Sequence, residues 1–396
     1  MVIRFIARLY STQGLRPGRP SNNLTAGIVG LANVGKSTFF QAITNSKLGN
    51  PANYPFATIE PAEARVVVPS AELDHLANLY GSGKRIPAVL TIFDIAGLTR
   101  GASRGDGLGN KFLNDIRHVD GIYQVVRGFD GQEITHIEGS VDPTRDLSIV
   151  QDELILKDLE FLEGVREKVE KMSKRTPRTS IEYKDHLFEI EFLNRLEEHM
   201  YEGRKIWNFK DNTWTENEVA VLNKHNFLTA KPTVILLNVG VQDYVHKENR
   251  HLQEVRDWVE EYSPGSQLLL FSAEFETIYN AQNVAQPFQS AMSEIILEMR
   301  KSLGLISFFT CGPLEARQWT IREGSLAPEA AGVIHTDLEK TFISADITKY
   351  TDLAELSPPL QESQLKSQAK VKRAGKNYLM QDKDVVFFKA AASSKR

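Results

Sequence analysis

A phosphate-binding loop is indicated by residues 30–37, in which two glycines separated by four residues precede Lys36 and Ser37. In a loop of this kind the backbone N–H groups converge on the phosphates of a nucleotide, and the helix that follows adds the positive end of its dipole. Lys36 would bring its charge to the β- and γ-phosphate oxygens, and Ser37 would offer its hydroxyl to Mg²⁺. The alternative is a glycine turn with a purely structural role.

Two later segments could hold the metal ion and the terminal phosphate. Thr58 follows the loop by roughly twenty residues, a distance at which a switch segment brings a threonine to the metal. Asp94 ends an apolar run and can hold Mg²⁺ through water, and the backbone N–H of Gly97 can contact the γ-phosphate. The glycine-rich run 101–109 is typical of a mobile switch. Together these segments predict a nucleoside triphosphatase of the small-GTPase type.

Short apolar runs precede these motifs and predict the strands that position them. Their spacing by helical segments favours an α/β fold with a parallel sheet covered on both faces, and such sheets bind ligands at the carboxyl ends of their strands. Each polar motif lies at one of those ends. The expected strands are residues 24–30, 89–94, 121–127, 234–238 and 268–271.

A long helical insertion interrupts this pattern between the third and fourth strands. Apolar residues recur at steps of three and four over residues 146–172 and again over 181–200, on either side of a breaker at 176–179. Two amphipathic helices joined by a short polar turn form an antiparallel hairpin. We expect its apolar stripes to bury each other, and a dedicated groove for a partner is the alternative.

The composition excludes several classes of protein. The 396 residues carry a formal net charge of −4 and an ordinary share of hydrophobic and charged residues, which argues against wholesale disorder. No apolar run approaches the roughly 20 residues that a membrane-spanning helix needs. The single cysteine, Cys311, excludes an intrachain disulfide framework and a cysteine-rich zinc site.

The amino-terminal end differs in charge from the rest of the chain. Residues 1–59 hold six basic and no acidic residues, a charge of +6, and the remainder carries −10. Four arginines lie beside apolar residues in the first 20 positions, which is typical of a mitochondrial transit peptide. We therefore expect residues 1–23 to be a disordered leader that directs the protein to the mitochondrial matrix. The alternative is a frayed basic terminus on a cytoplasmic protein.

Six segments of the chain resemble the YchF or Obg-like ATPase family. The likeness extends over residues 25–389. The segments that carry it are Gly30–Thr38, Asp94–Leu98, Gly107–Leu113, His136–Pro143, Arg317–Ile321 and Ala330–Asp337. The resemblance implies a P-loop G domain with a mostly parallel sheet, an inserted α-helical hairpin and a C-terminal β-grasp module, the TGS domain.

This resemblance also divides the chain into domains. The G domain is expected in two pieces, residues 24–144 and 212–303, and the helical hairpin lies between them at 145–211. The TGS domain is expected over residues 304–390, followed by a short tail at 391–396.

The resemblance further implies what the chain binds. Proteins of this family look like GTPases but prefer ATP, which they hydrolyse as Mg²⁺-dependent switches. We expect a partner on the ribosome or among RNA-associated machinery, reached through the TGS domain and the hairpin, and a K⁺ site beside the phosphates at Asn33. The nucleotide-binding residues carried over are Asn33, Val34, Gly35, Lys36, Ser37 and Thr38, and the metal ligands are Ser37 and Thr58, with Asp94 as a third.

Two residues expected near the γ-phosphate are unusual in type: Leu98 differs from the residue found in Ras-like GTPases, and Gln124 differs from the residue usual in the family. Leu98 stands where Ras-like GTPases keep a water-orienting glutamine, as it does in the family. Gln124 replaces a histidine that family members usually carry, and a glutamine can orient a water molecule but cannot act as a base near neutral pH. The expected catalytic residues are Lys36, Gly97 and Gln124. A regulatory module that binds nucleotide without hydrolysing it is the alternative.

The base-reading segment lacks the carboxylate that guanine requires. After the fourth strand the sequence has Val241 where GTPases have the aspartate of Asn-Lys-x-Asp. Asn238 and Val239 are expected to contact the purine, together with Ser272 after the fifth strand. Because guanine would leave its N1–H and amine unpaired at a valine, ATP is expected to bind more tightly than GTP. A GTPase is the alternative, since Asp243 lies two residues further on.

Overall fold

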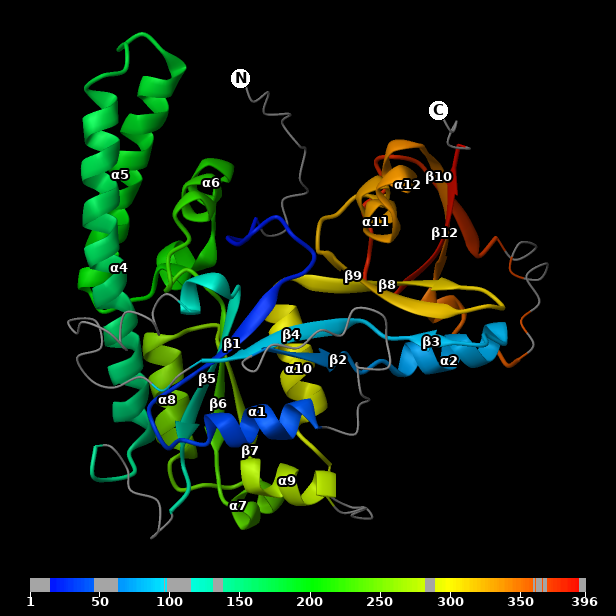
Figure 1. Cartoon of the computed structure of the whole chain (residues 1–396), viewed down its shortest axis with the longest axis horizontal. Helices are drawn as coiled ribbons and strands as arrows, with labels where there is room; N and C mark the ends of the chain where they lie inside the picture. Colours follow the sequence, from blue (N-terminus) through cyan, green and yellow to red (C-terminus); the bar gives the residue numbers. More distant parts are fainter. Residues whose placement is uncertain are drawn as a thin grey trace.

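The computed structural model describes residues 15–45, 63–95, 97, 115–130, 138–281, 289–358, 360, 365 and 369–391. Thr58, Leu98 and the run 101–109 lie outside these residues. Two six-stranded sheets organise the described part of the chain, and a long helical hairpin projects away from them (Figure 1).

The first sheet contains the five strands expected from the sequence and one more. Its strands are β1 (Thr25–Val29), β2 (Glu63–Val67), β4 (Val89–Asp94), β5 (Gly121–Arg127), β6 (Thr233–Asn238) and β7 (Gln267–Phe271). The order is β2-β4-β1-β5-β6-β7, and every neighbouring pair is parallel except β2 with β4. β5 and β6 are buried along their whole length, which is why most of their residues are apolar. The predicted mostly parallel α/β sheet is confirmed.

Helices cover both faces of this sheet. They include α1 (Lys36–Thr44), α4 (Pro143–Ser173), α8 (Leu252–Tyr262) and α10 (Met292–Ser302). Tyr123 of β5 contacts two of them: its ring packs edge-on against Phe39 of α1, with 5.8 Å between centroids, and its hydroxyl donates to the carbonyl of Ile295 in α10 at 3.0 Å. In Figure 1 α4 and α8 lie on the other side of the sheet. With both faces covered, a ligand can reach the sheet only at its strand ends, and sheets of this kind bind ligands at the carboxyl ends.

The expected helical hairpin is present and has a core of its own. Besides α4 it comprises α5 (Ile181–Tyr201), the 3₁₀ segment η2 (Ile206–Asn212) and α6 (Glu216–His225). The first half of α4 belongs to the core of the sheet, through Leu147 and Val150. The hairpin's separate core begins at Ile155 and ends at Ala230. The expected boundaries at 145 and 211 shift accordingly, because the apolar stripe of α4 is divided between two cores.

The second sheet forms most of the C-terminal domain. Its strands are β3 (Arg85–Ile86), β8 (Leu305–Cys311), β9 (Ala316–Arg322), β10 (Phe342–Lys349), β11 (Val371–Ala374) and β12 (Asp384–Ala390). β8 and β12 run parallel, with β9 antiparallel to β8 and β10 antiparallel to β12. Helix α11 (Ala327–Ile334) packs its alanines onto Phe308 and Ile321, and α12 (Thr336–Lys340) follows it. The arrangement agrees with the expected β-grasp module.

A segment from the first part of the chain completes this second domain. Helix α2 (Ala71–Tyr80) buries Leu73 and Leu76 in one cluster with Phe309 and Val385. The short strand β3, next in sequence, pairs in parallel with β9 at the edge of the second sheet. The expected range 24–144 therefore contributes to both domains. The amphipathic pattern of α2 predicts that one face of the helix packs against another element, but it does not indicate which of the two sheets that element is.

The residues just before β1 are attached to the body of the molecule. Arg19 forms an ion pair with Asp120 at 2.6 Å, and the N–H of Gly18 donates to Asn223 at 2.7 Å. Leu15 packs against the hairpin core. Residues 15–23 are thus fixed by specific contacts although the sequence assigned them to a leader, so a removable leader would have to end before Leu15.

The helices of the described residues include none that is both long and apolar enough to cross a membrane.

Candidate nucleotide site

The loop between β1 and α1 has the backbone that its glycines imply. Gly35 has φ +97° and Asn33 has φ +62°, both in the left-handed region. A Cβ at Gly35 would lie 2.3 Å from the side-chain nitrogen of Asn238, so any other residue there would displace that side chain. No side chain within the described residues caps the start of α1, and its first turn contains no acidic residue. The N–H groups of Ser37 and Thr38 therefore remain for an anionic ligand.

Lys36 lies within this loop. It is 8 % exposed, and its Nζ donates to the carbonyl oxygen of Leu31 at 2.6 Å. Burial lowers the pKa of the Lys36 amine to about 8, and the nearby carboxylate of Asp94 opposes that change. A Cβ at Gly97 would lie 3.0 Å from the same Nζ, so the Gly97 backbone lies beside the amine. The two residues predicted to hold the terminal phosphate are thus neighbours.

Two of the three predicted metal ligands also meet. The hydroxyl of Ser37 donates to the carboxylate of Asp94. Burial raises the pKa of the Asp94 carboxyl, while the Ser37 hydrogen bond and the charge of Lys36 oppose the rise. A hydroxyl and a carboxylate are oxygen donors of the kind that Mg²⁺ accepts alongside water and phosphate, so this pair fits the expected ion. Thr58, the remaining predicted ligand, lies outside the described residues.

Asn238 joins the phosphate loop to the neighbouring strand ends. It is 3 % exposed; its amide nitrogen donates to the carbonyl of Val34 at 3.0 Å, and its amide oxygen accepts from the N–H of Ala273 at 3.0 Å. The sequence predicted a contact between Asn238 and the purine. In the structure its side chain links the end of β6 to the loop and to the start of α9 (Ala273–Ala281). Asn238 therefore positions the loop, a function that the sequence did not indicate.

The other residues expected at the base are buried or apolar. Val239 is 2 % exposed and belongs to the core of the first sheet, and Ser272 is fully buried, its hydroxyl accepting from the N–H of Phe275 at 3.3 Å. Val241 opens α7 (Val241–His246) and is half-buried. Asp243 accepts a hydrogen bond from the side chain of Asn249 at 2.7 Å. The nearest carboxylate considered for guanine thus already has a partner.

Two family models match the chain. Residues 25–157 match the family described as "50S ribosome-binding GTPase". Residues 305–391 match the YchF-GTPase_C family, whose description reads "Protein of unknown function". The first match contains the phosphate loop and Asp94, and the second covers most of the C-terminal sheet.

Relatives match almost the full length. A Saccharomyces cerevisiae protein described as "Obg-like ATPase homolog" is 61% identical over 390 residues, which are 94% of this chain and 96% of its own. The Homo sapiens protein "Obg-like ATPase 1" is 41% identical over 388 residues, 95% of this chain and 96% of its own. The chain belongs to the Obg-like ATPase family. It is therefore a nucleotide-binding P-loop protein, and its GTPase domain is that of a nucleotide hydrolase family.

A solved structure agrees with the family and with the fold. The Schizosaccharomyces pombe YchF GTPase superposes with a TM-score of 0.84 at 44% identity, covering 95% of this chain and all of its own. The agreement extends over the G domain, the hairpin and the C-terminal domain, so all three units are those of the Obg-like ATPases.

Gln124, which the sequence analysis expects near the γ-phosphate, lies inside the first sheet. It is 4 % exposed on β5, opposite Val29 of β1, the residue that leads into the phosphate loop. Among the residues that the structure describes, no group accepts a hydrogen bond from its amide nitrogen. A buried donor left unpaired costs on the order of 1–3 kcal/mol, and such groups in native structures call for a functional explanation. The sequence placed the residue in a buried strand but did not indicate that its amide nitrogen would lack a partner among the described residues.

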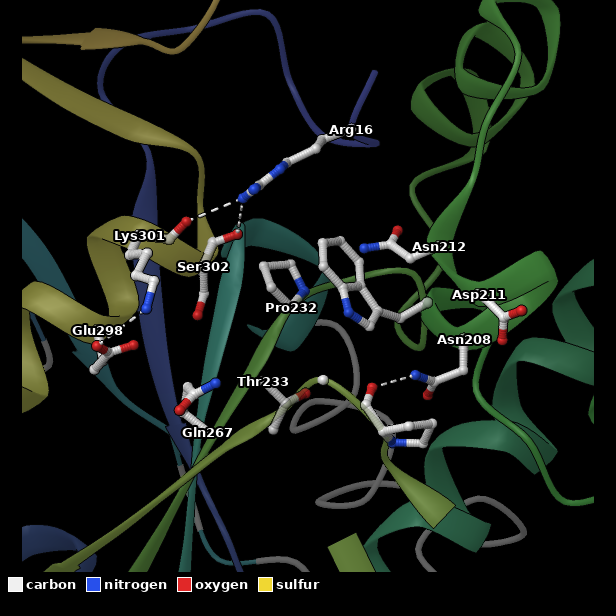
Figure 2. A pocket seen from close by; sticks show the side chains of 13 residues that line it. Arg16, Asn208, Asp211, Asn212, Pro232, Thr233, Gln267, Glu298, Lys301 and Ser302 are labelled. Carbon is white, nitrogen blue, oxygen red and sulfur yellow. Dashed lines mark hydrogen bonds and ion pairs between the residues drawn. The ribbon is translucent and has the colours of Figure 1, made fainter. Parts of the chain in front are cut away.

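A hollow of about 400 Å³ lies at the amino ends of β6 and β7, and Figure 2 shows the side chains that line it. Its lining includes Thr233 and Gln267, which begin β6 and β7, and the side chains of Arg16, Glu298 and Lys301. Arg16 donates to the backbone carbonyl of Lys301 at 3.0 Å. Because the hollow adjoins the amino ends of the strands, it is distinct from the candidate nucleotide site at their carboxyl ends.

Proposed function

We propose that the chain binds ATP with Mg²⁺ in preference to GTP and hydrolyses it slowly, as a molecular switch. One observation carries the proposal: the phosphate end of the site has the residues that a nucleoside triphosphate with Mg²⁺ requires, and the base end lacks the carboxylate that guanine requires. At the phosphate end, Lys36 lies beside the Ser37–Asp94 pair. At the base end, Val241 replaces a carboxylate, and Asp243 is held by Asn249.

Each residue of the phosphate end has a defined task in this proposal. The N–H groups at the start of α1 bind the β-phosphate, and Lys36 neutralises charge shared by the β- and γ-phosphates. Ser37 and Asp94 hold Mg²⁺, with Thr58 as a further ligand, and the ion offsets the charge that develops on the phosphates during transfer. The Gly97 N–H holds the γ-phosphate.

Gln124 is the chain's candidate for orienting the attacking water. Leu98 offers no polar group for this task, and an amide can orient water without removing its proton. Hydrolysis is accordingly slow. The alternative, a regulatory module that binds nucleotide without hydrolysing it, is favoured by the same two residues and acts through partner binding alone.

A phosphate-release assay separates the two alternatives. The wild type is compared with Lys36→Ala under single-turnover conditions with Mg·ATP. An ATPase releases phosphate at a rate that Lys36→Ala abolishes. Release equally slow in both proteins contradicts hydrolysis and leaves the regulatory module.

Potassium is proposed to stimulate hydrolysis. Asn33 has the left-handed backbone of a turn residue and an exposed position on the phosphate loop, from which a side-chain oxygen could reach a monovalent cation beside the β- and γ-phosphates. The rate in potassium chloride then exceeds the rate in sodium chloride at equal ionic strength. Equal rates contradict a potassium site.

A ribosome or RNA-associated partner and a mitochondrial location complete the proposal. The G domain matches a family described as a ribosome-binding GTPase. The arginines of the leader support import into the matrix, with the leader ending before the anchored residues 15–23. A fluorescent protein fused to residues 1–20 is expected in mitochondria. Fluorescence in the cytosol would contradict the proposed mitochondrial targeting.

A further inference from the structure

The free end of the helical hairpin carries a strong positive charge. We call residues 171–184, from the last turn of α4 to the first turn of α5, the hairpin tip. It contains five basic residues and one acidic residue, a formal charge of +4, in a chain whose total is −4. Figure 1 shows this end of the hairpin projecting beyond the two sheets, away from the phosphate loop.

The rest of the hairpin has the opposite charge. Residues 143–170 of α4 hold four basic and eight acidic residues, and residues 185–201 of α5 hold one basic and five acidic residues. Each of these stretches therefore has a charge of −4. An anionic partner is attracted to the tip and repelled along the body of the hairpin, so the charge pattern directs it to the end of the arm.

The cations of the tip are exposed and available. Lys174, Arg175, Arg178 and Lys184 are all exposed, and none of them forms an ion pair with an acidic side chain in the part of the chain that the structure describes. Lys171 is the exception, since it contacts Glu167 one turn earlier at 3.1 Å. Cations without internal partners keep their full charge for a ligand.

The turn that presents these cations has a fixed backbone. The N–H of Arg175 donates to the carbonyl of Met172 at 3.0 Å, and the N–H of Ser180 donates to that of Pro177 at 2.9 Å. The Ser180 hydroxyl then accepts from the N–H of Tyr183 at 3.2 Å and caps α5. The amino end of α5 adds the positive end of its dipole to the same surface. The charges are thus held in place before any partner arrives.

We propose that the hairpin tip binds the phosphate backbone of RNA. The inference rests on the RNA-associated partner proposed above and names the surface that meets it. Arginine and lysine on an ordered turn suit phosphate oxygens, and contacts to phosphate are governed by charge. The hairpin's own core begins at Ile155, so the part of α4 from there to Ser173 is about 28 Å long at about 1.5 Å per residue, and the tip can reach a recessed backbone.

An anionic membrane surface would also attract the cations of the tip, but the tip has few apolar side chains that could insert into the bilayer. Its large exposed apolar side chains are Ile181, 79 % exposed, and Met172, 47 % exposed. An interfacial helix needs a continuous apolar face, and here the outward-facing residues around these two are charged or polar. The observations favour RNA.

The test compares two triple variants that remove the same charge. The tip variant is Lys174→Ala, Arg175→Ala, Arg178→Ala. The control is Lys84→Ala, Arg256→Ala, Lys340→Ala, three exposed cations without an ion pair among the described residues, each on a different part of the surface. Circular dichroism verifies that both variants keep the helical content of the full chain.

Binding of a fluorescein-labelled RNA stem-loop is measured by anisotropy over a series of potassium chloride concentrations, without nucleotide. The tip variant is expected to bind at least tenfold more weakly at low salt, and the slope of log K against log salt should fall by about 2–3. The control should change by less than twofold. Equal weakening in both variants, or no RNA binding by the wild type, overturns the proposal.

Two further measurements separate this inference from the proposed ATPase. The tip variant should hydrolyse Mg·ATP at the wild-type rate, since the tip is remote from Lys36, so loss of RNA binding with normal hydrolysis supports the surface even if the ATP preference fails. Wild-type binding to phosphatidylserine vesicles that exceeds binding to the stem-loop would overturn RNA in favour of a membrane.

Discussion

The phosphate end and the base end of the nucleotide site lie on the same sheet. They differ in how many of their polar groups are available to a ligand. At the phosphate end, Lys36 and the Ser37–Asp94 pair already lie beside the open start of α1. At the base end, the polar groups of Asn238 and Asp243 are bonded to the protein itself. The first end offers a cation and oxygen donors to a ligand, and the proposed selection of the purine at the second end depends on the carboxylate that is missing at Val241.

This difference has a physical origin. A triphosphate with Mg²⁺ is recognised by charge and by backbone N–H groups, which any sequence with the loop supplies. A base is recognised by hydrogen bonds at its edge, and a missing partner excludes the wrong base by leaving its polar groups unpaired. In the proposed function the phosphate end therefore provides affinity for the nucleotide, and the base end provides the preference for ATP over GTP.

Replacing Lys36 should produce the largest effect. Lys36→Ala removes a buried cation from the phosphates, and a hydrogen bond to a charged group contributes about 1.5–3 kcal/mol, a loss of roughly tenfold to a hundredfold or more in affinity. Isothermal titration with non-hydrolysable ATP and GTP analogues should show both ligands weakened alike. Lys84→Ala serves as the control and should bind both analogues as the wild type does.

Raising the pH tests the same charge without a mutation. The pKa of Lys36 is lowered to about 8 by burial, so the free protein loses this proton between pH 7 and pH 9. Because only the protonated amine attracts phosphate, ATP affinity should fall by about tenfold over that interval. Lys36→Arg keeps its charge throughout and should show a flat profile. A wild-type profile equally flat would contradict the shifted pKa.

Removing the side chain of Asn238 tests whether this residue positions the phosphate loop or contacts the base. Asn238→Ala loses the links to Val34 and Ala273, which should lower the free energy of unfolding by about 1–3 kcal/mol. If Asn238 positions the loop, ATP and GTP analogues should both bind several-fold more weakly at a constant ratio. A changed ratio would show instead that its amide reads the base.

Substitution of Gln124 should give the smallest change. Gln124→Met keeps the volume of the side chain and removes the unpartnered amide nitrogen, so the free energy of unfolding should stay the same or rise by up to about 1–3 kcal/mol. Nucleotide affinity should not change. Single-turnover hydrolysis should slow if the amide orients water, and an unchanged rate would remove Gln124 from the mechanism.

The sequence predicted those parts of the molecule that have a local signature. Five strands of the first sheet and both hairpin helices follow from apolar periodicity, and the phosphate loop follows from residue spacing. Long-range choices could not be predicted in this way. Helix α2 has an ordinary amphipathic stripe, yet it covers the second sheet, and the single buried stripe of α4 is shared between two cores.

The site shows the same division. The neighbours of Lys36, Ser37 and Asp94 were predictable because the strand ends of a parallel sheet converge at one edge. The links from Asn238 to Val34 and Ala273 depend on where loops far apart in sequence meet, and the engagement of Asp243 with Asn249 depends on the turn that follows α7. Neither contact leaves a pattern in the sequence.

The preference between the two purines tests the central claim most directly. Titrations of the wild type and of Val241→Asp with ATP and GTP, in the presence of Mg²⁺, give four dissociation constants. We predict that the wild type binds ATP at least tenfold more tightly than GTP, since guanine would leave buried polar groups unpaired at Val241, and that Val241→Asp narrows this ratio by strengthening GTP binding. Wild-type affinity for GTP equal to or higher than that for ATP would contradict the account and identify the chain as a GTPase.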